Sequence, residues 1–549
     1  MQLTEMMLTQ RPGIATARGA KQWLLTLPLS DARCAHHAIT SLLLEMAEAP
    51  PLPRDRLEIL ETIRSHAVAI DRQYSVRYAS RPLPLGPAER NAFSHAQAQW
   101  RGLASAYLDC FEATLDNADL APCRALCLAR AGDYFCASLK GHFRAGQSGT
   151  TDLIDDLERL TDLAAEYQLQ ETRARDSLHP RGTTSVSLIR QRELLIALAG
   201  ATTSGRERDA LFDLAALWEG KVTCLPLVPG VRDGARTGCE MASATPPKRQ
   251  RVVDLGTSAY LIDATRLSRS LARRMRKIDS GVAFDGLRLP APVRHLPTRD
   301  LLARVRRVWC DRNVAPAPAQ VVRLHGANRG QGVGVSYAGS DFSAMYYMVA
   351  GDPFILNQTD DGTSRRSFDE LFVFQHVSVA RNDELTREAM CHFEDWEVDD
   401  GDGDALNLRR VRVGARLRVG QLMTMRLRLA GEDALVTLAE VRRLQEPVFD
   451  PRYPGAINAR VQLLNGKPHA VGVRAGRGGG REGRLWSAGI RLGSLHAKES
   501  VTLVLPNGWF KPDHQFDMQD AGIVYRLRLT ALRRRGFDFE EIEAEIVSA

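Results

Sequence analysis

The apolar residues of this chain change their spacing partway along it, and this change constrains the fold more than any other feature. In the segment 53–74, PRDRLEILETIRSHAVAIDRQY, apolar residues recur every three or four positions, as on one face of a helix. Beyond residue 318, alternation with a period of two replaces this spacing, which is typical of strands. We therefore predict a multidomain α+β protein, with an all-α N-terminal half of helical hairpins followed by a β-rich C-terminal half. Further helices are expected at 119–142, 151–176, 186–201 and 206–219.

The 549 residues are too many for one ordinary domain, and the composition indicates where the chain divides. The stretch VPGVRDGARTGCEMASATPPKRQR is rich in Gly, Pro, Ser and charged residues, as linkers are. We expect an all-helical interaction domain, a linker, a helical connector, a β-barrel with a helix insertion, and a C-terminal β-rich unit. These parts are expected, in that order, over residues 1–225, 226–256, 257–317, 318–466 and 467–549.

The strands of the C-terminal half are short and regularly spaced. In LMTMRLRLAG, Met423, Met425 and Leu427 alternate with Thr424 and Arg426, so we expect one face of this strand to be buried. Similar runs follow in ALVTLAEVRRL, INARVQLL, SVTLVLP and IVYRLRLTAL, separated by turn residues. Such a series predicts a barrel or a sandwich. One helix, in SDFSAMYYMVAG, is expected to interrupt the series and to end at Gly351.

Composition restricts the class of protein only mildly. The 73 basic and 66 acidic residues leave a net charge of +7, a small excess that permits an anionic partner without requiring nucleic acid. Nine scattered cysteines, no 18-residue apolar stretch and no secretory signal predict a cytoplasmic protein with reduced thiols and no membrane span. A zinc site built from Cys123, Cys127, Cys136 and His142 is the alternative to apolar cysteines in a helical core, and the core is favoured because CxxC knuckles are absent.

A basic helix is expected over residues 266–276, with Leu267, Leu271 and Met275 on one side and arginines over the rest. A solvated surface helix is the simpler interpretation, and contact with an acidic partner or a phosphate is the other. Together with the Arg- and Gly-rich segment 474–484, this helix supports an alternative function, a nucleic-acid-binding regulatory protein. Nucleic acid is nevertheless the less favoured partner, because the charge excess of the chain is small.

An acidic run, WEVDDGDGDALNL, is the most unusual stretch of the C-terminal half. Asp400, Asp402 and Asp404 fill positions 1, 3 and 5 of a calcium loop, but Ala405 stands where that loop needs Gly and Val411 where it needs Glu. The run therefore predicts a hairpin turn and no metal site. The Gly-rich segment 325–339 lacks the spacing of a phosphate loop, and no paired carboxylates, triad or cofactor loop indicates an enzyme.

The order of segments around this turn resembles the PilZ domain, a small β-barrel that receives the bacterial second messenger cyclic di-GMP. FEDWEVDD, the turn, ALNLRRV, GARLRVGQLMTMRLRL, LVTLAEVRRL and ARVQLL follow one another as in that family, over residues 318–466. The family's D/N-x-S-x-x-G turn would place Asp400 at the first position, Asp402 at the Ser and Ala405 at the Gly. A long helical half before a divergent PilZ-like half is similar to proteobacterial proteins of this group.

The resemblance implies a ligand, a site and a role. PilZ domains bind cyclic di-GMP through an R-x-x-x-R pair and the acidic turn, so the implied nucleotide-binding residues are Arg323, Arg329, Asp400 and Asp402. Arg323 and Arg329 are six positions apart instead of four, and Asp402 puts a charge where the family has a hydroxyl, which favours a barrel that has lost the nucleotide over a receptor. No other cofactor is expected. The implied role is a cytoplasmic, non-enzymatic signalling or adaptor protein in motility, pilus or exopolysaccharide control, with a protein partner on the helical half.

Overall fold

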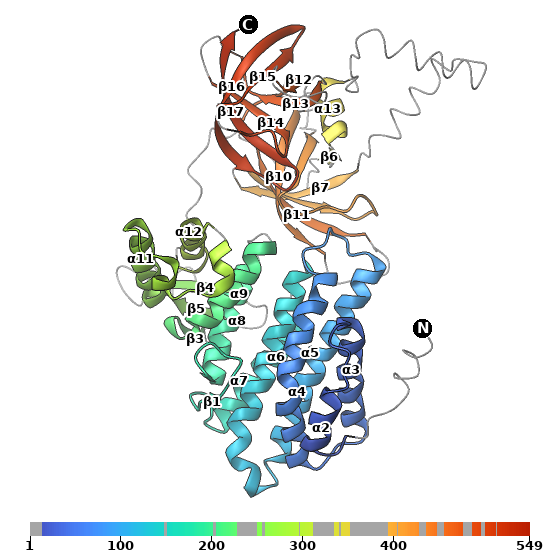
Figure 1. The fold of residues 1–549 in the computed structure, drawn as a ribbon, viewed down its shortest axis with the longest axis vertical. Coiled ribbons are helices and arrows are strands. Elements are labelled where there is room, and N and C mark those ends of the chain that lie inside the picture. The colour runs from blue at the N-terminus through green and yellow to red at the C-terminus, as the bar shows by residue number, and fades with distance from the viewer. Residues whose placement is uncertain are drawn as a thin grey trace, which may run out of the picture. The chain divides into compact units, whose positions relative to one another are not determined.

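The computed structural model describes residues 14–147, 151–200, 205–227, 250–254, 259–295, 297–310, 334–339, 342–351, 394–402, 404–427, 435–446, 455–475, 486–495, 500–511 and 513–548. The chain forms two compact units. Unit 1 comprises Met1–Arg81 and Leu85–Ala315, and unit 2 comprises Pro82–Pro84 and Pro316–Ala549. Figure 1 labels most of the helices and strands of both units. No helix among the described residues is both long and apolar enough to cross a membrane.

Unit 1 is built from helices, as the apolar spacing predicts (Figure 1). Successive helices pack against one another, most extensively α5 on α6, and α4 also packs on α5. A three-stranded antiparallel sheet in the order β3-β5-β4 and a minor pair, β1 and β2, complete the unit. The helices are α2 (Ala17–Leu24), α3 (Ala32–Glu48), α4 (Pro53–Tyr74), α5 (Pro87–Ala113), α6 (Arg124–Arg144), α7 (Thr151–Glu166), α8 (Val186–Gly200), α9 (Gly205–Trp218), α11 (Thr265–Asp279) and α12 (Thr298–Trp309). The strands are β1 (Ala174–Arg175), β2 (Thr183–Thr184), β3 (Thr223–Leu227), β4 (Gln250–Asp254) and β5 (Ala259–Asp263).

Local chemistry explains where these helices begin. Asp31 caps α3 by accepting hydrogen bonds from the backbone N–H groups of Arg33 and Cys34, at 3.0 and 3.2 Å. Proline occupies the first turn of α4 and of α5, where its missing N–H group leaves no hydrogen bond unmade. The expected helix start near Pro53 is therefore confirmed.

The predicted helix over 151–176 is too long, because α7 ends at Glu166. Gln168 adopts a left-handed conformation with φ of 56°, and its N–H donates to the carbonyl of Ala165 at 3.2 Å. The N–H of Leu169 then reaches back to the carbonyl of Ala164 at 2.8 Å, which completes a Schellman-type ending. This ending usually carries Gly, and a Gln in its place gave no signal in the sequence.

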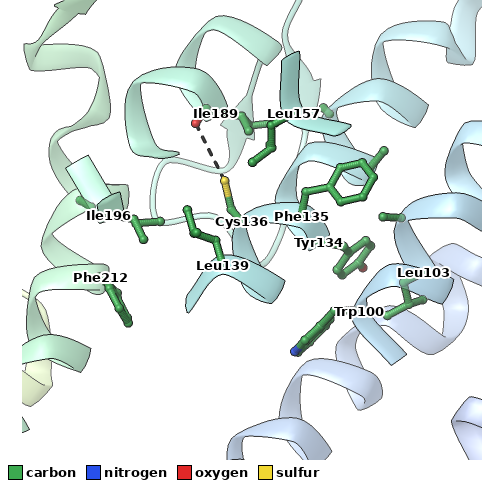
Figure 2. Packing of buried hydrophobic residues seen from close by; sticks show 14 of the residues in the cluster. Trp100, Leu103, Tyr134, Phe135, Cys136, Leu139, Leu157, Ile189, Ile196 and Phe212 are labelled. Carbon is green, nitrogen blue, oxygen red and sulfur yellow. Dashed lines mark hydrogen bonds between the residues drawn. The ribbon is translucent and has the colours of Figure 1, made fainter. Parts of the chain in front are cut away.

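The cysteines weighed as zinc ligands lie in or against the helical core. Cys127 and Cys136 belong to the large cluster of buried apolar residues, and Cys123 packs on its edge. Cys136 lies between Phe135, Leu139 and Ile189, and its thiol points to the carbonyl oxygen of Ile189 at 4.0 Å (Figure 2). Burial raises the pKa of the Cys136 thiol to about 11, so the thiol is protonated at neutral pH, as expected of a cysteine in an apolar core.

His36 on α3 is fully buried and makes the stability of unit 1 dependent on pH. Its ring stacks on Tyr74 at 4.1 Å between centroids, and neither ring nitrogen has a hydrogen-bond partner among the described residues. Burial, with repulsion from His37 and His95, lowers the pKa of His36 to about 3. The unfolded chain takes up this proton near pH 6.5, so the stability present above pH 6.5 is lost as the pH falls toward 3.

We therefore expect the His36→Leu variant to lose less stability in acid than the wild type. When the pH falls from 7.5 to 4.5, the free energy of unfolding of the wild type should decrease by about 3 kcal/mol more than that of the variant. The reason is that the imidazole of His36 is neutral in the folded chain and takes up a proton on unfolding. Urea denaturation followed by circular dichroism at both pH values measures it. A Leu43→Ala variant, altered at a buried apolar residue of the same helix, should keep the wild-type pH dependence. Equal acid losses in wild type and His36→Leu would contradict the expectation.

Unit 2 contains two closed antiparallel barrels, which confirms the predicted β-rich half with a barrel (Figure 1). The first has the strand order β10-β11-β8-β7-β6-β9 and the second β12-β13-β14-β17-β16-β15. The strands are β6 (Gly334–Gly339), β7 (Trp396–Asp402), β8 (Ala405–Arg410), β9 (Leu422–Leu427), β10 (Leu435–Gln445), β11 (Ile457–Leu463), β12 (Pro468–Ala475), β13 (Ser487–Leu492), β14 (Ser500–Pro506), β15 (Gln515–Asp520), β16 (Ile523–Arg535) and β17 (Phe539–Ser548).

The predicted interrupting helix is α13 (Phe342–Ala350), followed by Gly351 with φ of 81°. It packs against β6 and β9 of the first barrel and against β12 and β13 of the second. This packing corrects the expectation for β9, where Thr424 was to face solvent. Thr424 is fully buried, as is Leu422 on the same side of the strand, and Leu422 lies in one apolar cluster with Met345 of α13. A strand covered on both sides loses the alternation of burial that a half-exposed strand shows.

Candidate functional site

The acidic run forms the hairpin turn that the sequence predicts, between β7 and β8 of the first barrel. Asp400 pairs with Asn407 and Asp402 with Ala405, so the chain reverses over the two intervening positions. The turn is attached to β11, because the carbonyl oxygen of Asp404 accepts a hydrogen bond from the N–H of Leu463 at 2.7 Å. No cluster of three or more His, Cys, Asp or Glu side chains that could hold a metal ion occurs within the described ranges.

Asp400 stands at one end of a row of paired residues that crosses four strands of the barrel. Asn407 on β8 lies opposite Arg460 on β11, and Arg460 lies opposite Arg443 on β10. Side chains of paired residues project to the same face of a sheet. Arg460 and Arg443 are exposed and Asn407 is half-buried, so this face is the outside of the barrel. The row joins four neighbouring strands and therefore spans roughly 15 Å.

A second row on the same face lies two residues further along these strands. It contains Gln445 on β10, Asn458 on β11 and Arg409 on β8, which are register partners in turn. Arg409 and Asn458 are exposed. We call Arg409, Arg443 and Arg460, with Asn407 and Asn458, the arginine face of the first barrel.

Within the described residues, no carboxylate forms an ion pair with the arginines of the arginine face. Arg443 and Arg460 are directly opposite each other, an arrangement of like charges that destabilises a sheet. Among the described residues, the guanidinium of Arg443 donates to the side-chain oxygen of Gln445 at 2.7 Å. Among the residues that the structure describes, Arg409, Arg443 and Arg460 form no ion pair with a carboxylate.

Two neighbouring arginines of this barrel, Arg410 and Arg442, each form an ion pair with a glutamate. Arg442 lies 3.1 Å from the carboxylate of Glu440. Arg410 points inward, is 1 % exposed, pairs with Glu394 and has its guanidinium 5.2 Å from the centroid of the Trp396 ring. Its Nη1 also donates to the carbonyl oxygen of Ala415 at 2.9 Å. These two arginines each pair with a glutamate, whereas no such pair is formed by the arginines of the arginine face among the described residues.

The arginine face has the chemistry to bind a phosphorylated ligand. Guanidinium groups donate two parallel hydrogen bonds to phosphate oxygens and stack on flat rings, and lysine cannot replace them in either role. The side-chain amides of Asn407 and Asn458 could bond the edges of a base. The face would therefore suit an anion that carries both phosphates and aromatic bases.

The structure brings together only part of the site that the sequence resemblance implies. Asp400 occupies the end of the first row, and Asp402 lies two positions further along β7, beside the turn. Arg323 and Arg329 lie outside the described residues, as do most of the Arg- and Gly-rich segment 474–484 and the Gly-rich segment before β6. Sequence reasoning missed Arg409, Arg443 and Arg460. Their signal was present as outward positions in the alternating segments LNLRR, VRRLQ and INARV.

Comparison with known proteins concerns the helical part of the chain. Residues 18–228 match the family model described as cyclic-di-GMP receptor FimW, N-terminal domain. The match covers α2 to α9 and less than half of the chain, and it does not extend to the barrels. No curated protein and no solved structure matches the chain. Over its helical region, the chain is therefore similar to the N-terminal domain of the cyclic-di-GMP receptor FimW.

Proposed function

We propose that this chain is a cyclic di-GMP receptor with a signalling role, and that the ligand binds on the arginine face of the first barrel. The observation that carries the proposal is the opposed pair Arg443 and Arg460, which forms no ion pair among the described residues and stands in one row with positions 407 and 400. A cyclic dinucleotide supplies two phosphates for guanidinium groups and two guanines for stacking. The family match of the helical region supports the same ligand independently of the barrel.

The proposal favours the receptor over a barrel that has lost its nucleotide. Asp402 adds negative charge beside a dianionic ligand, but the three arginines of the face outweigh it. We propose that Arg323 and Arg329 join Asp400 and Asp402 in this site, as the PilZ resemblance implies. We also propose that the chain divides into five parts, with boundaries at residues 225, 256, 317 and 466. We propose separately that the helical domain, residues 1–225, contacts a protein partner.

We further propose that the protein is a non-enzymatic cytoplasmic adaptor that transmits ligand binding to machinery for motility, pili or exopolysaccharide. Asp400, Asp402 and Asp404 belong to one short β-hairpin, and carboxylates crowded into one turn of the sequence do not make the separated acid and base pair that catalysis needs. A pull-down of the full chain with and without cyclic di-GMP tests the adaptor role. A partner captured to the same extent in both samples would contradict it.

Replacing Arg443 or Arg460 with alanine should weaken binding of cyclic di-GMP to the full chain at least tenfold, or about 1.4 kcal/mol. Each change removes a guanidinium from the face without removing a buried group, so the barrel should stay folded. Isothermal titration calorimetry measures the affinity. The control is Arg528→Ala on β16, an exposed arginine paired with Glu545 at 2.7 Å, which should bind as the wild type does.

Two outcomes of the same titration would count against the site. One is a wild-type chain that takes up no cyclic di-GMP, which would restore the hypothesis of a barrel without its nucleotide. The other is unchanged affinity in both arginine variants, which would move the ligand away from the arginine face. Arg323→Ala and Arg329→Ala extend the test, because a loss of affinity in either would support the R-x-x-x-R role that the resemblance implies.

A further inference from the structure

Ser270 on α11 is the centre of a second group of basic residues, in unit 1. Its hydroxyl oxygen lies 2.5 Å from Lys221 Nζ and 2.5 Å from Arg274 Nη1, and both groups donate to it. Two cationic side chains therefore meet on one neutral oxygen. Because both lone pairs of that oxygen are used, the hydroxyl has its own proton left to donate. No acceptor takes that proton among the residues that the structure describes.

Both cations are held in place by other contacts. Arg274 donates from Nε to the carbonyl oxygen of Leu287 at 3.0 Å, and its guanidinium lies 5.3 Å from the centroid of the buried Trp218 ring. Lys221 is half-buried at the end of the short 3₁₀ helix η3 (Glu219–Lys221), which packs against α11. The two positive groups are thus fixed by the fold and are not freely moving surface side chains.

Three further arginines add to the charge around them. Arg181 donates to the carbonyl oxygen of Leu217 at 2.7 Å, and its Nη1 lies 2.6 Å from the point where a Cβ would stand on Gly220. Burial lowers the pKa of Lys221, and Arg274, Arg181 and Arg273 lower it further. Burial likewise lowers the pKa of Arg274, with Arg273 and Arg288 adding to the effect.

No carboxylate compensates this cluster in the part of the chain that the structure describes. Lys221, Arg181, Arg273, Arg274 and Arg288 form no ion pair there. Other arginines of the same region are compensated: Arg294 pairs with Asp285 at 2.5 Å and Arg299 with Asp279 at 2.7 Å. Lys221 and Arg274 are partly buried and donate to one oxygen without a counter-ion among the described residues, an arrangement whose free-energy cost a bound anion would lower.

We propose that Lys221, Ser270 and Arg274, with Arg181, Arg273 and Arg288 around them, form a binding site for a phosphate group of a small ligand. A phosphate offers several oxygens at once, so it can accept from an ammonium, from a guanidinium and from the Ser270 hydroxyl. Convergence of the donors on one point suits a compact anion better than the extended backbone of a duplex. The site lies in unit 1 and does not depend on nucleotide binding to the first barrel.

Inorganic pyrophosphate is the probe for the first test, titrated calorimetrically into the full chain at low ionic strength. We expect saturable binding with one site per chain. Lys221→Gln and Arg274→Gln should each weaken it about tenfold or more, as loss of a charge-assisted hydrogen bond does. Arg276→Gln is the matched control: it removes the same charge from an exposed position of α11 and should change the affinity less than about twofold.

Further titrations distinguish a small phosphorylated ligand from nucleic acid and lipid, and the site in unit 1 from the arginine face. Pyrophosphate binding that is lost in Lys221→Gln while cyclic di-GMP binding is kept would support a separate site in unit 1. The proposal would be overturned by absent pyrophosphate binding, or by equal losses in Arg276→Gln and Lys221→Gln. It would also be overturned by pyrophosphate binding that only Arg443→Ala abolishes, or by binding only to duplex DNA or to phosphatidylglycerol vesicles. Circular dichroism of each variant checks that α11 remains folded.

Discussion

Replacing Asp176 with alanine is expected to lower the free energy of unfolding of unit 1 by about 3–5 kcal/mol. Asp176 follows β1 and is buried between two buried arginines. Its Oδ1 lies 2.8 Å from Arg64 Nη2 on α4, and its Oδ2 lies 3.1 Å from Arg130 Nη1 on α6. The side chains of Arg64, Arg130 and Asp176 are 6 %, 2 % and 3 % exposed. One carboxylate therefore neutralises two desolvated guanidinium groups and joins two helices that are far apart in the sequence.

The size of the effect follows from what the substitution leaves behind. Burial raises the pKa of Asp176, but Arg130, Arg64 and the N–H of Leu178 outweigh it and bring the pKa down to about 2. The folded chain thus stabilises the carboxylate strongly. Without Asp176, Glu61 remains as a partner of Arg130 at 2.8 Å. Its contact with Arg64 is longer, at 3.8 Å, and Glu61 is partly exposed. Arg64 would keep Glu61 as its counter-ion only at 3.8 Å, and it would lose the shorter, buried contact of 2.8 Å.

Urea denaturation followed by circular dichroism at 222 nm reports on the helices of unit 1 and measures this loss. Asp279→Ala is the matched control, since its pair with Arg299 is about half exposed on both sides. It should change the free energy of unfolding by less than about 1 kcal/mol, as exposed pairs do. A loss below about 1 kcal/mol in Asp176→Ala would mean that water or another group compensates the two arginines.

The elements of this protein could be predicted from the sequence because their signals are local. The spacing of Leu57, Leu60 and Ile63 places a helix, and the alternation of Met423 and Met425 places a strand. The errors fall where a residue's surroundings come from elsewhere in the chain. Thr424 is buried because α13 and the second barrel cover the outer side of β9, and no feature of β9 itself carries that information.

The candidate site was predictable only in part, for the same reason. Asp400 could be proposed from the sequence because the acidic run is conspicuous and resembles a known turn. Arg443 and Arg460 gave no comparable signal, because each looks like an ordinary outward arginine until the pairing of β10 with β11 sets one opposite the other. The cluster around Ser270 gave even less signal in the sequence, since Lys221 and Arg274 come from different elements and meet only in the folded unit.

The second large effect is expected at the junction of the two barrels, which share one apolar cluster. Phe539 begins β17 of the second barrel and is fully buried against residues of both barrels and of α13. Polar contacts surround it: the N–H of Leu422 donates to Asp538 at 2.9 Å, and the N–H of Phe537 donates to the carbonyl oxygen of Gly420 at 2.6 Å. Arg534 of β16 also pairs with Glu440 of β10 at 3.1 Å. The ring of Phe539 fills the centre of this junction.

Phe539→Ala should therefore destabilise unit 2 by about 3–5 kcal/mol, through lost burial and the cavity that remains. Because the ring packs on both barrels, we expect faster hydrogen exchange in β9 and β10 as well as in β14 and β17, measured by mass spectrometry of the full chain. Phe537→Ala is the control, two residues away and 51 % exposed, and it should cost no more than about 1 kcal/mol. Faster exchange confined to the second barrel would show that each barrel is stable by itself. Loss of protection in both would show that the two barrels fold as one cooperative unit, in which case a ligand on the first would also stabilise the second.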